Sequence, residues 1–235
     1  MAQNIKKILV WGDSIFKGVA LDETGRYRVL PENCGALFGA AHPVELINHS
    51  RFGCTVHKAE ATARADLAKH PDAQYAVIEL GGNDCDFDWS QVELAPESEH
   101  EPNTPLPEFR AAMQRMIEAA RAAGVIPVLT TLPPIEPNRF FASISRGRSA
   151  ERLLQWLGSA FSTYRWQESY SDAVADLARK HRVPLLDIRS AFLTDRHYER
   201  LICADGMHPN AGGHRLIART LDTLLRDPTA LAVGE

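Results

Sequence analysis

The chain has 235 residues, of which 45% are hydrophobic and 24% are charged. This balance is typical of one globular domain, or at most two small ones, and excludes wholesale disorder. The 26 lysines and arginines against 30 aspartates and glutamates give a formal charge of −4, which disfavours a nucleic-acid-binding protein. No apolar run approaches the roughly 18 residues that a membrane-spanning helix needs, so we expect no membrane insertion.

The beginning of the chain lacks the pattern of a secretory signal peptide. Its first apolar stretch, 8–11, is too short for the hydrophobic region of such a peptide, and no small-residue cleavage site follows it. We therefore expect a cytoplasmic protein. The four cysteines show neither metal-finger spacing nor a CxxC pair, so we expect free thiols.

Short apolar runs alternate with longer amphipathic patterns along the chain. Near-continuous apolar runs are typical of strands buried on both faces, and they occur at 8–11, 44–47, 75–80, 125–132 and 183–188. Helical spacing of apolar residues predicts helices at about 55–69, 107–123, 165–181 and 211–226. The alternation predicts a single α/β domain over 1–235, a three-layer α/β/α fold whose flavodoxin-like five-stranded parallel sheet has the strand order 2-1-3-4-5.

Two connections are longer than this plan requires. Residues 84–106 form an acidic loop that contains Asp86 and Trp89 and no lysine or arginine up to Glu101. A carboxylate and an indole suit the hydroxyls and rings of a sugar and are poor partners for anionic phospholipid or coenzyme A. The alternative is that the acidic loop is only a solvated face.

The second long connection, 133–164, is rich in aromatic residues and arginine. It follows the fourth strand, so we expect a lid or helical insertion that reaches over the site, with Phe140 and Trp166 as parts of an apolar wall. Two alternatives stay open. The aromatic side chains could pack a helical hairpin onto the core, or the segment could be an interface of a homo-oligomer.

Ligands of parallel α/β sheets bind at the carboxyl ends of the strands, and a candidate site residue follows each of three predicted strands. Ser14 follows the first strand in Gly-Asp-Ser, Gly53 follows the second, and Asn83 follows the third in Gly-Gly-Asn-Asp. A serine at a strand-to-helix turn is placed to act as a nucleophile, although an N-cap serine is the common alternative. An asparagine amide there can donate a hydrogen bond to a developing oxyanion.

Asp205 and His208 lie on one loop just before the last predicted helix. A carboxylate three residues before a histidine can bind one ring nitrogen, fix the tautomer and stabilise the imidazolium. The other nitrogen is then free to act as a base toward a serine. A metal-ligand role for His208 finds no companion cluster in the sequence.

The four motifs together resemble the GDSL, or SGNH, hydrolase family, over about residues 8–226 and in the family's order. The resemblance implies Ser14 as the nucleophile, His208 as the general base and acid, and Asp205 as its orienting carboxylate. It implies an oxyanion hole made of the Ser14 and Gly53 backbone N–H groups and the Asn83 side chain. It also implies the SGNH hydrolase fold, no metal and no cofactor.

The expected function is therefore that of a serine hydrolase that cleaves a small-molecule carboxylic ester through an acyl-serine intermediate. The acidic loop and its tryptophan favour a small acyl group such as acetyl, with an acylated carbohydrate as one substrate class. A thioesterase or lysophospholipase acting on longer acyl chains is the alternative. A flavodoxin-like binding module without catalysis is a further alternative, which the complete set of serine, histidine and aspartate disfavours.

Overall fold

The structure is a computed structural model that describes residues 7–226. At its centre lies a five-stranded sheet in which every neighbouring pair of strands is parallel. The strands are β4 (Glu45–Asn48), β1 (Lys7–Gly12), β5 (Tyr75–Glu79), β6 (Ile126–Thr130) and β7 (Leu185–Leu186), in that spatial order. In order along the chain this is 2-1-3-4-5, so the predicted fold class and strand order are confirmed.

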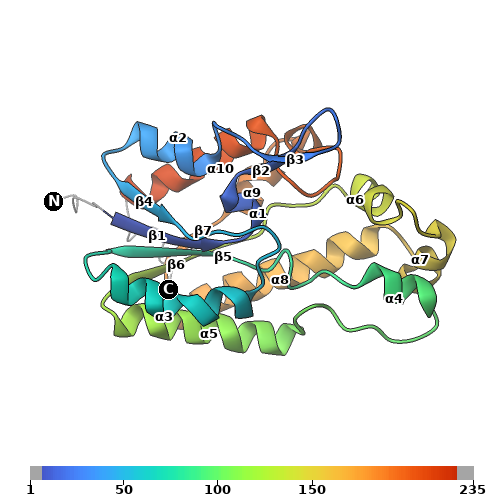
Figure 1. Ribbon diagram of the computed structural model, residues 1–235, viewed down its shortest axis with the longest axis horizontal. Helices are drawn as coiled ribbons and strands as arrows, with labels where there is room; N and C mark the ends of the chain where they lie inside the picture. The colour runs from blue at the N-terminus through green and yellow to red at the C-terminus, as the bar shows by residue number, and fades with distance from the viewer. Residues whose placement is uncertain (1–6, 227–235) are drawn as a thin grey trace.

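Helices cover both faces of the sheet (Figure 1). One face carries α3 (Val56–Lys69), α5 (Leu106–Ala122) and α8 (Phe161–His181), and the other carries α2 (Cys34–Ala41), α9 (Ile188–Leu193) and α10 (Ala211–Arg226). Alternate strand residues point to opposite faces, so Leu9 packs in the core on the α3 side and Ile8 in the core on the α10 side. Among the helices within 7–226, none is both long and apolar enough to cross a membrane.

Several elements differ from the sequence prediction. The last strand has only two residues, because the Asp187 side chain accepts a hydrogen bond from the Ser190 N–H at 3.0 Å and starts α9. The long helix predicted from residue 165 begins at Phe161. The hairpin of β2 (Val19–Leu21) and β3 (Tyr27–Val29) and the helix α2 have no predicted counterpart, since such short elements give almost no periodic signal.

Both long connections contain helices and lie at the carboxyl ends of the strands (Figure 1). The acidic connection 84–106 includes α4 (Trp89–Leu94), and 133–164 includes α6 (Pro137–Ile144), α7 (Ala150–Leu157) and the first turn of α8. Their apolar side chains form a third cluster, separate from the two cores beside the sheet. This third cluster positions the walls of the site described next.

Candidate active site

Ser14, His208 and Asp205 form a continuous chain of hydrogen bonds at the carboxyl end of β1. His208 Nε2 lies 2.8 Å from Ser14 Oγ, and His208 Nδ1 lies 2.7 Å from Asp205 Oδ2. All three residues are buried, with exposed fractions of 6%, 1% and 1% in the order Ser14, His208, Asp205. The three sequence-predicted residues are therefore brought together across a separation of almost the whole chain, in the order serine hydroxyl, imidazole and carboxylate.

The loop that carries Asp205 and His208 is stabilised by hydrogen bonds to the Asp205 carboxylate. Asp205 Oδ1 accepts hydrogen bonds from the Met207 and His208 N–H groups, at 3.0 and 3.1 Å. Burial alone would raise the pKa of the Asp205 carboxyl, but the bonds from His208 and from these backbone groups hold it below the ordinary value. The carboxylate is therefore ionised and fixes the orientation of the imidazole.

Position 206, inside this loop, requires a glycine because the backbone of α6 packs closely against it. Its φ is +76°, and a Cβ at this position would lie 2.2 Å from the Phe140 backbone nitrogen. Its carbonyl oxygen accepts a hydrogen bond of 2.8 Å from the Glu136 N–H, and Arg139 donates to the Glu199 and Ile202 carbonyls. The start of α6 thus braces the segment that leads to His208.

Asp13 connects the turn that carries Ser14 to Asn83. Its Oδ1 accepts a hydrogen bond of 2.8 Å from the Ile15 N–H and so caps the short helix α1 (Ser14–Lys17). Its Oδ2 accepts a bond of 3.0 Å from Asn83 Nδ2. An amide nitrogen has two donors, so one N–H of Asn83 is fixed by Asp13 and the second is left for a ligand beside Ser14.

Glu79, the last residue of β5, lies beneath this pair and was not singled out in the sequence. It is fully buried, its Oε2 accepts a bond of 3.3 Å from the Asp13 N–H, and its Oε1 has no partner. Burial raises the pKa of Asp13 to about 6, and burial with the nearby Asp13 charge raises the pKa of Glu79 well above the ordinary value. The Ile15 N–H and the Asn83 amide both donate to Asp13 and favour its charged form, so of this buried pair Glu79 holds a proton more readily.

Gly53 and Asp84 border the site in different ways. Gly53 has a φ of +65°, and its carbonyl oxygen accepts a bond of 2.8 Å from Lys58 Nζ; an oxyanion role for its N–H stays a prediction. Asp84 is buried and accepts bonds from the Val56 N–H at 3.0 Å and from Thr104 Oγ1 at 2.7 Å. This carboxylate holds loops together, as expected for a structural acid.

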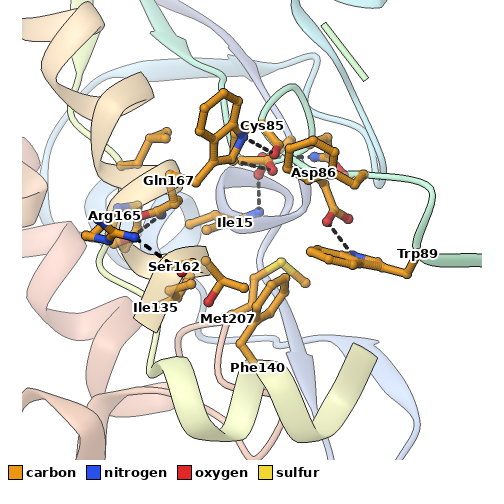
Figure 2. Close-up of a pocket in the computed structure, with 18 of the residues that line it drawn as sticks. Ile15, Cys85, Asp86, Trp89, Ile135, Phe140, Ser162, Arg165, Gln167 and Met207 are labelled. Atoms are coloured by element: carbon orange, nitrogen blue, oxygen red, sulfur yellow. Dashed lines mark hydrogen bonds between the residues drawn. The ribbon is translucent and has the colours of Figure 1, made fainter. Parts of the chain in front are cut away.

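A pocket of about 450 Å³ is lined in part by Ser14 and Asn83. Figure 2 shows the other residues that form its walls. The pocket is walled by the third apolar cluster and includes all four residues expected from the sequence to contact a substrate: Asp86, Trp89, Phe140 and Trp166. Phe140 and Met207 lie beside the indole of Trp89 in this wall (Figure 2), and the ring centroids of Phe140 and Trp89 are 6.5 Å apart. Sequence reasoning missed Met207, which lies next to His208 and has no motif of its own.

Most polar groups of the pocket already have partners within the protein. Trp89 Nε1 donates to Asp86 Oδ1 at 2.8 Å, and Trp166 Nε1 donates to the Cys85 carbonyl at 2.9 Å. Gln167 donates to the Pro133 carbonyl at 2.7 Å and accepts from Arg189 at 2.8 Å. Burial also raises the pKa of the Asp86 carboxyl. The surface left for a ligand is therefore mainly apolar.

Two aromatic rings contact the imidazole of His208. The Tyr27 ring centroid lies 5.0 Å from that of the imidazole, and the Phe52 ring is stacked on the imidazole at 6.1 Å with an interplanar angle of 10°. The sequence motifs did not indicate either residue, although Phe52 directly precedes Gly53. Tyr27 reaches the site only because the β2–β3 hairpin folds back over it.

Within 7–226, no group of three or more histidine, cysteine, aspartate or glutamate side chains is placed to hold a metal ion.

Comparison with known proteins agrees with this geometry. Residues 10–216 match the family model described as the GDSL-like lipase/acylhydrolase family. The chain belongs to this family. Membership makes it a carboxylic ester hydrolase of the GDSL/SGNH type, with the set of serine, histidine and aspartate that is typical of the family. No curated protein matches the chain.

Solved structures of the same fold cover the chain almost completely. A catalytic mutant of the acetylxylan esterase Axe2 from Geobacillus stearothermophilus is 19% identical, with a TM-score of 0.67 and coverage of 96% of each chain. The lipase/acylhydrolase from Enterococcus faecalis is 20% identical, with a TM-score of 0.65 and coverage of 95% of this chain and 98% of that one. TesA is 21% identical, with a TM-score of 0.62 and coverage of 93% and 98%.

Proposed function

We propose that this GDSL-family hydrolase acts through an acyl-serine intermediate, with Ser14 as the nucleophile. The observation that carries the proposal is the unbroken chain from Ser14 Oγ through His208 to Asp205, with both hydrogen bonds at 2.8 Å or less. His208 takes the proton of Ser14 Oγ as that oxygen attacks the ester carbonyl, and then gives it to the leaving alcohol. Water activated by the same imidazole releases the acid.

In this mechanism the oxyanion of the tetrahedral intermediate is held by the second Nδ2 proton of Asn83 and by the Ser14 and Gly53 N–H groups. The hydrogen bond from Asn83 to Asp13 supports this role, because it fixes the amide before substrate binds. A donor that needs no reorganisation is the kind that stabilises developing charge most strongly.

The acyl group is the part of the substrate that the pocket constrains. A volume of about 450 Å³ falls within the range that holds ligands of drug size, which is far more than acetyl needs. The indole N–H groups of Trp89 and Trp166 donate to the protein itself, and one of the two amide N–H groups of Gln167 donates to the Pro133 carbonyl. The preferred substrate is therefore an ester whose acyl group is apolar and larger than acetyl.

A second candidate substrate is the acetyl ester of a carbohydrate. It is favoured by the Asp86 carboxyl and the Arg165 guanidinium, which line the same pocket and keep hydrogen-bonding capacity beyond their internal contacts. In that case the sugar, rather than the acyl chain, would fill the pocket against the indole rings. The two candidates differ in the acyl length they predict.

The test is the hydrolysis of p-nitrophenyl esters from acetate to palmitate by the wild type and by Ser14→Ala. The first candidate predicts kcat/KM highest between butyrate and octanoate, and loss of that activity in the variant. A maximum at acetate would favour the carbohydrate ester, which a panel of acetylated sugars would then check. A maximum at palmitate, with hydrolysis of acyl thioesters, would favour a thioesterase. Equal activity of Ser14→Ala would contradict the mechanism.

A further inference from the structure

The aromatic pair Tyr27 and Phe52 lies on the side of Ser14 that faces away from the acyl pocket. Phe52 follows β4, and Tyr27 belongs to the hairpin that follows β1. The pocket lining comes mainly from segments that follow β5 and β6, from α7 and α8, and from Met207. Since the spatial strand order is β4-β1-β5-β6-β7, the aromatic pair and the pocket flank the nucleophile from opposite directions. Neither Tyr27 nor Phe52 lines the pocket.

The two rings and the imidazole form one mutually contacting group. Tyr27 and Phe52 have ring centroids 5.5 Å apart, and each ring contacts His208. His208 is only 1% exposed beneath them, whereas Tyr27 remains 45% exposed and Phe52 57% exposed. The pair therefore offers an apolar aromatic surface to solvent directly above the catalytic imidazole.

The chemistry of acylation brings the leaving group to this surface. The bond from Ser14 Oγ to the carbonyl carbon forms, and the bond to the alkoxy oxygen breaks with its electron pair staying on that oxygen. The proton that His208 Nε2 took from Ser14 then moves to the alkoxy oxygen. That oxygen must lie within hydrogen-bonding distance of Nε2. With the acyl group in the pocket on the β5 and β6 side, the substituent on this oxygen extends toward the rings that cover His208.

We propose that Tyr27 and Phe52 form the leaving-group subsite and select esters of alcohols that carry an aromatic or other flat apolar ring. This proposal rests on the acyl-serine mechanism and on the acyl group occupying the pocket. Aromatic rings gain from offset or tilted stacking with a further ring, and the exposed faces and edges of Tyr27 and Phe52 are free for it.

The Tyr27 phenol is held neutral at this subsite. Burial and the nearby Asp205 carboxylate raise its pKa to about 12. The phenol therefore adds no negative charge to the surface above His208 near neutral pH.

The test compares benzyl and ethyl esters of the same acid, butanoic acid. Both alcohols are weakly acidic to a similar degree, so the ratio of their kcat/KM values reports contact with the ring rather than leaving-group chemistry. We expect the wild type to prefer the benzyl ester, and Phe52→Ala to lower the ratio by about three- to tenfold, the effect of one lost ring pair. Tyr27→Ala should lower it similarly, and Tyr27→Phe, which keeps the ring, should restore most of it.

Phe161→Ala is the matched control, because Phe161 is 58% exposed, lies at the start of α8 and is outside the pocket lining. It should leave the ratio at the wild-type value. If Phe52→Ala lowers kcat/KM for both esters by the same factor, the rings only shield His208 and the proposed subsite is wrong. If the wild type hydrolyses both esters through Ser14 but its ratio does not change in Phe52→Ala or Tyr27→Ala, the subsite is wrong and the proposed function stands. If neither ester is hydrolysed and a fluorophosphonate does not label Ser14, the proposed function itself fails.

Discussion

Asn83 donates a hydrogen bond of 3.0 Å to the carboxylate of Asp13, the residue that immediately precedes Ser14. The same carboxylate caps the turn that presents Ser14, at 2.8 Å from the Ile15 N–H. One buried acid therefore orients both the nucleophile turn and the proposed oxyanion donor. Both hydrogen bonds are formed within the protein itself, so this arrangement is in place before any substrate binds.

Asn83→Ala should lower kcat by about 10²–10³-fold and leave the protein folded, because it removes a donor to the oxyanion. The measurement is kcat for p-nitrophenyl butyrate, with circular dichroism as a check of the fold. Asn103→Ala is the control. Asn103 donates to the Asn83 carbonyl at 2.9 Å but does not line the pocket, so we expect a change of less than about tenfold. Equal losses in both variants would mean that Asn83 acts only by holding its loop.

Gly206→Ala should both destabilise the protein and reduce activity. A left-handed backbone costs free energy for a residue with a Cβ, and here the Cβ would also lie 2.2 Å from the Phe140 nitrogen. We expect a loss of more than about 1 kcal/mol in the free energy of unfolding, measured with urea, and at least a tenfold fall in kcat/KM as Asp205 and His208 move.

The control for this substitution is Gly147→Ala, at a glycine with a φ of +73° where an added Cβ would have no neighbouring atom within 4 Å. It carries the same backbone cost without the clash. A loss in Gly206→Ala no larger than that in Gly147→Ala would contradict the claim that α6 braces the histidine loop.

The stability of Glu79→Gln relative to the wild type should increase as the pH rises. Glu79 has a raised pKa in the folded state, so the folded protein binds the proton more tightly than the unfolded chain does. Stability from this group is complete below the ordinary carboxyl pKa and is lost as the pH rises toward the folded value. Glutamine mimics the protonated acid and does not titrate, so the variant does not show this loss of stability. The Tm difference between Glu79→Gln and the wild type should therefore be larger at about pH 8 than at about pH 5; a constant difference would contradict the assignment.

Trp166→Ala should move the acyl-chain optimum to longer esters, because the indole forms part of the pocket wall. Trp166 is 37% exposed, so water can replace the indole as a partner of the Cys85 carbonyl and the fold should persist. The measurement is the kcat/KM profile from acetate to palmitate. Trp166→Phe keeps most of the wall and should keep the wild-type optimum. An unchanged profile in Trp166→Ala would show that the acyl group does not enter this pocket.

The sheet was predictable because its strands are continuous apolar runs, and because polar residues at their carboxyl ends converge in any parallel sheet. That reasoning was enough to bring Ser14 and Asn83 to one edge. The three-residue spacing indicated a bond between Asp205 and His208. The hydrogen bonds from His208 to Ser14 and Asp205 also require the particular conformation of the 205–208 loop, which the spacing does not determine.

Other parts of the site could not be read from the pattern. Glu79 ends an apolar strand, and nothing in its neighbours along the chain indicates that it is buried against Asp13. Tyr27 lies in a hairpin of two three-residue strands, which are too short to give a periodic signal in the sequence. The acyl-length expectation depended on composition, whereas the pocket depends on which polar atoms already have partners. Those contacts exist only in the folded chain.

The proposed mechanism depends on a covalent intermediate at Ser14. The most direct measurement is mass spectrometry of the protein after treatment with a fluorophosphonate, which traps an activated serine. We expect a single adduct on the peptide that contains Ser14, no adduct in Ser14→Ala, and loss of ester hydrolysis in proportion to labelling. An adduct on another residue, or full hydrolytic activity after complete labelling of Ser14, would contradict the proposed mechanism.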